Sequence, residues 1–224
     1  MQLTLRNILE VFHVPEKVVH EWIEKHHMPC TMANEQYHFN YIAVLDWALE
    51  HQIKLTPEVL SLGEKHHQNQ GLIYEAVKKG GIYYDIPGQE REEAIKNIVD
   101  ILPLPEKSNR EALSAMLIVR ERLTSTAVGE GVALPHVRNP VVLPIDEALI
   151  TLSFLKNPVD FKAFDNKPVR VVFTLLTPSV KVHMAVLSRL AFFLQNPRLQ
   201  EHLQSKASSE KILAQIRVLE STTV

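Results

Sequence analysis

The 224-residue sequence is poor in cysteine, glycine and net charge, and it has no long apolar run. Its single cysteine, Cys30, excludes a disulfide within the chain and is typical of a reducing compartment. A net charge of −2 gives no general attraction to nucleic acids or acidic membranes. No apolar run approaches the roughly 20 residues of a membrane span, and the first residues lack the pattern of a signal peptide. We therefore expect a cytoplasmic protein without membrane insertion.

The turn and linker signals divide the chain into three parts. Apolar residues make up 46% and charged residues 22%, which suits a chain with one large core or two modest ones. Thr56-Pro57 predicts a helix start, and the polar run from 64 to 70 predicts its frayed end or a linker. We therefore expect an N-terminal unit at 1–54, a linker or helix at 55–71 and a larger domain at 72–224.

The N-terminal unit shows a pattern of helix, turn, helix, hairpin and helix. Thr4 is the expected N-cap of a helix with helically spaced apolar residues, Val14-Pro15 interrupts this pattern, and a second helix follows. The segment 28–39 predicts a short hairpin, and a third helix carries Trp47. This order resembles the small winged-helix domains of the excisionase/MerR type, in which the second helix reads DNA.

Charge in this unit argues against DNA binding. It has four basic residues, Arg6, Lys17, Lys25 and Lys54. It has seven acidic residues, Glu10, Glu16, Glu21, Glu24, Glu35, Asp46 and Glu50. Because lysine and arginine contacts to phosphates supply most non-specific affinity, we expect weak DNA binding at best. Protein docking or self-association into a homo-oligomer is the favoured alternative.

The sequence pattern of the larger domain predicts both strands and helices. Strands are expected at 82–86, 148–155 and 169–176, the last one apolar enough to be buried on both faces. Helices are expected at 72–79, 90–102 and 110–122. The pattern favours the α/β (α+β) class, with a mixed sheet flanked by helices.

The segment from Arg120 to His136 is the strongest functional signal. Gly129 and Gly131 permit a tight turn and close approach to a ligand, and Pro135 fixes the backbone before His136. A neutral histidine is a competent nucleophile near neutral pH. No second metal-binding side chain stands at the short spacing typical of zinc sites, so we expect no metal. Phosphoryl transfer needs a nucleophile, cationic or amide donors and close backbone approach, and this segment offers all three.

These residues resemble the signature of the fructose/mannitol-type enzyme IIA family of the bacterial phosphotransferase system, which includes nitrogen-regulatory members. The resemblance covers roughly residues 72 to 222 and implies the enzyme IIA type-2 fold. It makes His136 the phosphohistidine and Arg120 the active-site arginine. The segment 168–187 resembles the buried strand and following helix of the same family, and this makes His183 the second active-site histidine.

Several alternatives stay open for these residues. Arg120 could be a solvated helix residue, and Ser125 and Thr126 could cap a turn rather than contact phosphate. Ala127 and Glu130 depart from the usual pattern of the family. The Glu130 carboxylate would oppose a phosphoryl group unless it points away or pairs with Arg138.

The resemblance implies a phosphocarrier that accepts a phosphoryl group on His136 from HPr or a nitrogen-branch counterpart, without a cofactor. His183, Arg120 and the amides around Gly129 and Gly131 would stabilise the charged oxygens. The presence of the N-terminal unit at 1–54 favours a regulatory role through a downstream partner. The alternatives are a sugar-specific enzyme IIA that passes phosphate to an enzyme IIB, and a non-catalytic transcription-regulatory or binding protein.

Overall fold

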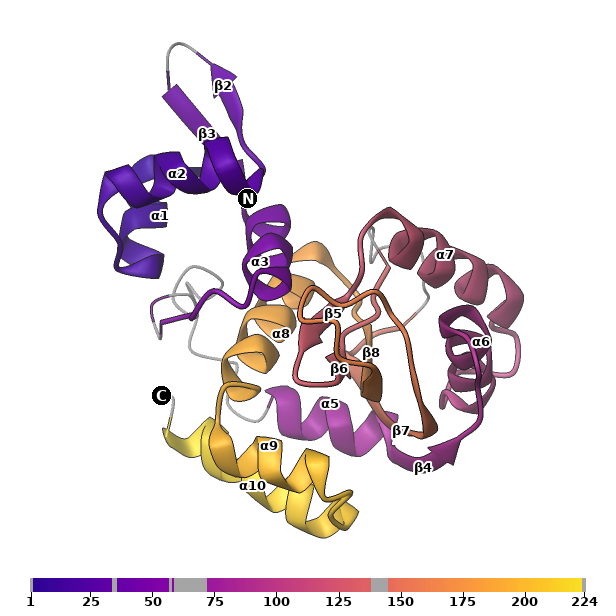
Figure 1. Ribbon diagram of the computed structural model, residues 1–224. Coiled ribbons are helices and arrows are strands. Elements are labelled where there is room, and N and C mark those ends of the chain that lie inside the picture. Colours follow the sequence, from indigo (N-terminus) through magenta and orange to yellow (C-terminus); the bar gives the residue numbers. More distant parts are fainter. Residues whose placement is uncertain (1, 34–35, 57, 59–71, 138–144, 223–224) are drawn as a thin grey trace.

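The computed structural model describes residues 2–33, 36–56, 58, 72–137 and 145–222. A small N-terminal head, residues 2–54 where described, lies on one side of a larger α/β body, and the last helix of the head, α3 (Tyr41–Glu50), faces the body (Figure 1). None of the helices in these ranges combines the length and the apolar character needed to cross a membrane.

The head is built as its sequence pattern predicts, with one additional strand. Helices α1 (Leu5–Phe12) and α2 (Glu16–His26) are followed by the hairpin β2 (Thr31–Ala33) and β3 (Gln36–Asn40). Thr4 caps α1 by accepting a hydrogen bond from the Asn7 amide, which confirms the expected cap. Strand β1 (Gln2–Thr4) pairs antiparallel with β3. It was not predicted, because three residues are too few to show the period of a strand.

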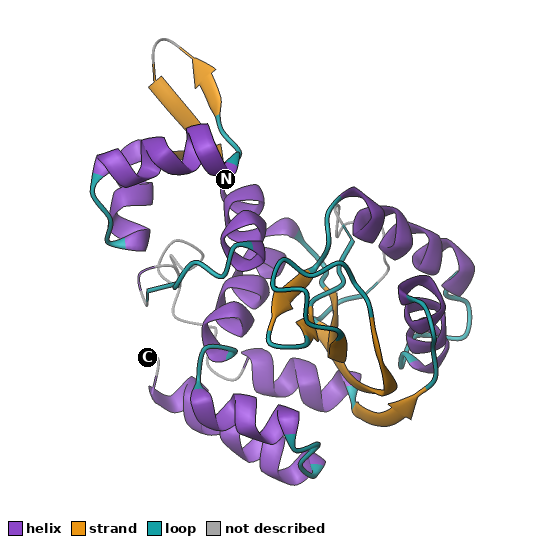
Figure 2. Ribbon diagram, in the orientation of Figure 1, coloured by secondary structure: helices purple, strands orange, loops and turns teal. Residues whose placement is uncertain are grey.

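The body contains a five-stranded mixed sheet with the strand order β4-β7-β8-β6-β5. Helices surround the strands of the body (Figure 2). Its strands are β4 (Ile82–Ile86), β5 (Ala127–Gly129), β6 (Val132–Ala133), β7 (Leu149–Val159) and β8 (Val169–Leu176). The neighbours β4 and β7 are parallel, β7 and β8 antiparallel, β8 and β6 parallel, and β6 and β5 antiparallel. The predicted mixed sheet is therefore confirmed.

Helices cover both faces of the sheet. One face packs against α6 (Arg91–Ile101) and α7 (Arg110–Leu123). The other face packs against α5 (Leu72–Gly80), α8 (Val180–Phe193), α9 (Pro197–Gln204) and α10 (Ser209–Thr222). Strand β8 supplies both cores, since Phe173 faces one layer and Val172 the other. Its almost complete burial confirms the prediction from its apolar sequence.

Helix α3 (Tyr41–Glu50) connects the head to the body. Asn40 caps its start, and its apolar face shares one continuous core with the side chains of α8. It also packs against β5, the strand that leads into the glycine turn. The predicted linker at 55–71 lies mostly outside the described residues. The packing of α3 brings a head element next to the segment that ends at His136.

Candidate active site

A reversal of the chain between β5 and β6 delivers His136 to the carboxyl end of β6. Gly129, Glu130 and Gly131 all have positive φ, at 89°, 52° and 74°. A side chain on Gly129 would collide with Gln52 from the end of α3. Pro135 then leads into His136, which forms an isolated parallel bridge with Leu175 of β8. The positive φ angles favour glycine at 129 and 131, as expected from the sequence.

The imidazole of His136 is held in one orientation by the backbone. Its Nδ1 lies 2.8 Å from the carbonyl oxygen of Leu134, an acceptor that cannot donate. Nδ1 therefore carries a proton and donates it to this oxygen. In the neutral ring the lone pair then belongs to Nε2. The side chain is only 3% exposed.

Arg120 projects from the last turn of α7 into the same site as His136. Its Nη1 donates to the Thr124 carbonyl at 2.8 Å, which fixes the guanidinium. Its Nη2 donates to Oδ2 of Asp46, also at 2.8 Å, and the side chain is 9% exposed. Arg120 is therefore a buried, oriented cation rather than the solvated residue that the sequence left possible.

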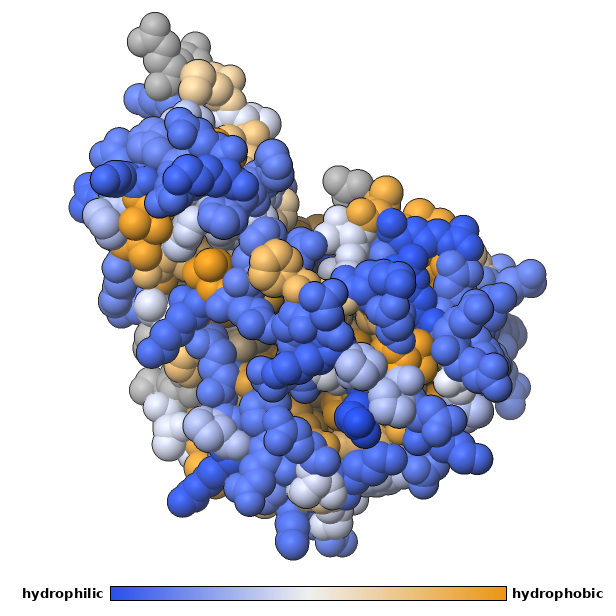
Figure 3. Space-filling view, in the orientation of Figure 1, coloured by the Kyte–Doolittle hydropathy of each residue, from blue (hydrophilic) through white to orange (hydrophobic). Residues whose placement is uncertain are grey.

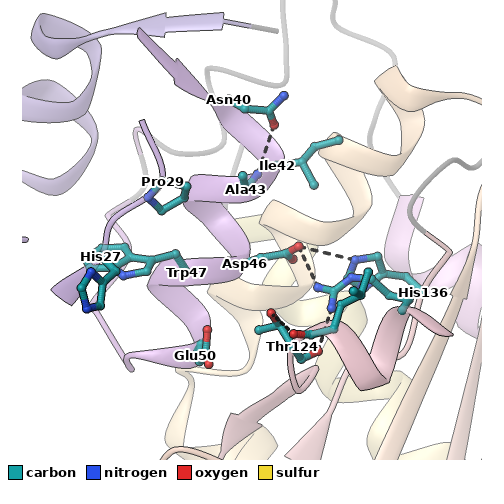
Figure 4. Close-up of a pocket in the computed structure, with 12 residues that line it drawn as sticks. His27, Pro29, Asn40, Ile42, Ala43, Asp46, Trp47, Glu50, Thr124 and His136 are labelled. Atoms are coloured by element: carbon teal, nitrogen blue, oxygen red, sulfur yellow. Dashed lines mark hydrogen bonds and ion pairs between the residues drawn. The ribbon is translucent and has the colours of Figure 1, made fainter. Parts of the chain in front are cut away.

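Asp46 reaches this site from α3 of the head. The same Oδ2 atom that accepts from Arg120 lies 3.7 Å from Nε2 of His136 (Figure 4). Burial by itself raises the pKa of Asp46, but hydrogen bonding and attraction from His136 and Arg120 outweigh it and leave this pKa below its usual value. Asp46 is therefore an ionised group between the cation and the nucleophile.

His183 lies in the first turn of α8, with its ring centre 5.0 Å from that of His136. Its Nδ1 is 3.3 Å from the hydroxyl oxygen of Thr177. Burial, with a smaller contribution from His136, lowers the pKa of His183 to about 3. The side chain is therefore neutral at physiological pH and can offer a hydrogen bond without adding charge.

The hydroxyl groups of Ser125 and Thr126 are both engaged by the protein. Ser125 donates to the Phe161 carbonyl at 2.7 Å. Thr126 donates its hydroxyl to Glu121 at 2.5 Å, and its amide donates to both oxygens of the same carboxylate. Burial raises the pKa of Glu121, and the bonds from Thr126 partly offset this effect. Both residues therefore fix the turn in the way that caps do.

Glu130, the unusual residue between the two glycines, pairs with a lysine. Its carboxylate accepts from Nζ of Lys167 at 2.7 Å, and its amide donates to Asp165 at 2.9 Å. The side chain is half exposed. Its charge is therefore compensated on the surface. The alternative partner Arg138 lies outside the described residues.

The nucleophile opens onto a cleft between the head and the body. The cleft has a volume of about 590 Å³ and is lined from α3 by Asp46, Trp47 and Glu50, and from the end of α7 by Arg120 and Leu123 (Figure 4). Burial raises the pKa of Glu50. The visible surface around the molecule is mostly hydrophilic, with apolar side chains in separated patches (Figure 3). Among the described residues, no cluster of histidine, cysteine or carboxylate groups could hold a metal ion.

The structure brings Arg120, His136 and His183 together, although Arg120 and His183 are 63 residues apart in sequence. Sequence reasoning missed Asp46 and Glu121. Glu121 follows Arg120 directly and could have been noticed as a buried acid on an apolar helix face. Asp46 gave one weak signal, a single acid among the buried Val44, Leu45 and Trp47 of α3.

The α/β body of this chain is similar in sequence to known proteins. Residues 75–218 match the family described as phosphoenolpyruvate-dependent sugar phosphotransferase system, EIIA 2. The nitrogen regulatory protein homolog of Haemophilus influenzae is 34% identical over 122 residues, which cover 54% of this chain and 73% of that protein. The fructose-specific EIIABC component of Bacillus subtilis is 29% identical over 144 residues, covering 63% of this chain and 22% of that longer protein.

A solved structure agrees with these sequence matches. The nitrogen regulatory protein IIA-Ntr of Neisseria meningitidis superposes with a TM-score of 0.57 at 29% identity, over 65% of this chain and 99% of that one. The match leaves out about a third of this chain. This protein belongs to the EIIA 2 family of the phosphotransferase system.

Proposed function

We propose that Nε2 of His136 accepts a phosphoryl group from the phosphohistidine of an HPr-type carrier. The observation that carries this proposal is the bond from Nδ1 to the Leu134 carbonyl, because it leaves the lone pair on Nε2, the nitrogen that faces the carboxylate oxygen bound by Arg120. The bond from Nε2 to phosphorus forms as the nitrogen–phosphorus bond of the donor breaks, and its electron pair returns to the donor's imidazole. The ring proton of His136 stays on Nδ1, which continues to donate a hydrogen bond to the Leu134 carbonyl oxygen.

Arg120 and His183 are proposed to stabilise the transferred oxygens. The guanidinium offers charge-assisted hydrogen bonds, which are about twice as strong as neutral ones. When the Thr177 hydroxyl donates to Nδ1 of His183, the ring proton belongs to Nε2 and is available for a phosphoryl oxygen. Amides of the turn around Gly129 and Gly131 are further donors. Ser125 and Thr126 are proposed to shape this turn, since their hydroxyls are already engaged.

An apolar rim beside the cleft fits the carrier protein. Val119 and Leu123 lie one turn apart at the end of α7, and Leu123 lines the cleft with its side chain 63% exposed. Exposed apolar side chains next to a reactive group are typical of a docking surface. The rim is therefore the proposed contact for the HPr-type carrier.

A regulatory role of the nitrogen type is favoured over sugar transport. Several relatives are named nitrogen regulatory proteins, and the family match begins only after the head. We propose that the head, rather than an enzyme IIB, connects phosphorylation to a downstream partner. A sugar-specific enzyme IIA remains the alternative. It would pass its phosphoryl group to a separate enzyme IIB, a transfer that can be measured directly.

We propose that the winged-helix-like head binds a protein rather than DNA. Two of its four bases are already paired, Arg6 with Glu10 at 2.9 Å and Lys25 with Glu21 at 2.8 Å. Met32, on the hairpin, is 64% exposed and apolar. We expect no salt-dependent binding to duplex DNA in an anisotropy titration, whereas micromolar binding would favour a DNA-reading head.

The phosphocarrier proposal is tested by incubation with phosphoenolpyruvate, enzyme I and HPr, followed by intact-mass analysis. We expect one phosphoryl group on the parent and none on His136→Ala. His202→Ala removes a histidine on α9, far along the chain from the site, and is expected to label like the parent. No labelling of the parent by carriers from both the sugar and the nitrogen branch would reject the proposal.

A further inference from the structure

Asp46 occupies the position where a phosphoryl oxygen would lie. One oxygen, Oδ2, accepts from Arg120 at 2.8 Å and faces Nε2 of His136 at 3.7 Å. These are the two groups that the proposed function assigns to the phosphoryl group. A carboxylate shares with a phosphoryl group the negative charge and the oxygen acceptors that bind arginine. The head therefore places a mimic of the phosphoryl group in the site (Figure 4).

The carboxylate and a phosphoryl group cannot both occupy this position. Non-bonded heavy atoms already need about 3.5–4.0 Å, so no phosphorus with its oxygens fits between Nε2 and Oδ2 at 3.7 Å. A phosphorylated histidine would also place a charge of about −2 against the ionised Asp46. Asp46 thus opposes the reaction by volume and by charge.

The burial of the reacting groups supports the same conclusion. His136 is 3% exposed and Arg120 9%, whereas transfer requires reacting atoms about 3–3.5 Å apart. The histidine of a second protein cannot approach that closely while α3 keeps its position. Two further contacts hold α3 there: Gln52 donates to Asp165 at 3.2 Å, and the ring of His51 lies 5.0 Å from that of Phe164.

We propose that α3 is an internal lid on the phosphorylation site, and that its Asp46 and the phosphoryl group on His136 exclude each other. This proposal rests on the proposed function. Because such coupling is reciprocal, displacement of Asp46 favours phosphorylation, and phosphorylation in turn displaces α3. The head that α3 connects to the body then moves, and this is the signal that a downstream partner reads.

Asp46→Asn in the full chain tests the lid. The amide keeps the shape of the side chain but removes its charge, so the displaced position of α3 becomes more populated, by up to about 5- to 150-fold for couplings of the usual size. Because transfer takes place from that position, we expect phosphoryl transfer from phospho-HPr to be faster by the same factor. Glu50→Gln is the matched control. It removes a neighbouring carboxylate of α3 that lines the same cleft without bonding to Arg120 or His136, and a much smaller change is expected.

The outcomes separate the lid from the proposed function. Faster labelling of Asp46→Asn with little change in Glu50→Gln supports the lid. An equal or slower rate in Asp46→Asn, or an equal gain in both variants, overturns it while leaving His136 as the acceptor. Absence of labelling in the parent and in both variants removes the proposed function as well.

A second measurement needs no change at Asp46. Both tryptophans of the chain, Trp22 and Trp47, lie in the head, and Trp47 lines the cleft and stacks on His51. Displacement of α3 changes this environment. We expect the tryptophan emission of the parent to shift when His136 is phosphorylated and to stay constant in His136→Ala under the same treatment. Unchanged emission in fully phosphorylated protein overturns the lid.

Discussion

Replacement of Glu121 by alanine should loosen the active-site turn and lower the stability of the fold. The carboxylate is 2% exposed and is the acceptor for both the amide and the hydroxyl of Thr126. A buried donor that loses its acceptor costs about 1–3 kcal/mol, so two donors set a range of about 2–6 kcal/mol. We expect Glu121→Ala to lower the free energy of unfolding by about 3 kcal/mol, in the lower half of this range. The raised pKa of Glu121 shows that burial of its carboxylate already carries a cost, which the alanine variant no longer has.

Urea unfolding of the parent and Glu121→Ala measures this loss, and Glu121→Gln tests its electrostatic part. Burial raises the pKa of Glu121 above 4.5, so its contribution to stability is complete below about pH 4.5 and declines as the pH rises through the folded-state pKa. Glutamine does not ionise. The difference in unfolding free energy between parent and Glu121→Gln should therefore be largest near pH 4 and smaller near pH 7. A difference that grows from pH 4 to pH 7, or a loss below about 0.5 kcal/mol in Glu121→Ala, would refute this reasoning.

Three other predictions concern single residues. His183→Gln should slow phosphorylation about tenfold or more. Because burial lowers the pKa of His183 to about 3, the parent loses stability as the pH falls from about 6.5 toward 3, and His183→Gln should lose less in acid unfolding curves. Glu220 accepts from the amide of Ile73 in the first turn of α5, so Glu220→Ala should lower the unfolding free energy by about 1–2 kcal/mol without changing the phosphorylation rate. Leu123→Asp should raise the KM for phospho-HPr with little change in kcat, since it alters the proposed rim and not the reacting groups; a KM equal to that of the parent would exclude the rim.

The sequence was most informative where the pattern was local. Thr4 caps α1 where a polar residue precedes an apolar run, and the apolar run at 169–176 forms the buried strand β8. Long, regular elements show their period over several turns or pairs of residues, and this makes them readable. Strand β1, with three residues, offered no period and was missed.

The candidate site was readable only in the part that one motif contains. His136 stands in a glycine-rich turn whose chemistry is visible in sequence, and the family resemblance added Arg120 and His183. Asp46 could not be found in this way, because its role depends on the packing of α3 against the body across 90 residues of chain. Such a contact follows from tertiary structure and leaves no local pattern.

The nitrogen of His136 that becomes phosphorylated can be observed directly. Long-range proton–nitrogen NMR on the phosphorylated, ring-labelled protein distinguishes the two ring nitrogens of His136. The Nδ1 bond to the Leu134 carbonyl predicts that Nε2 carries the phosphoryl group and Nδ1 keeps its proton. A phosphoryl group on Nδ1, or on a histidine other than His136, would contradict the account.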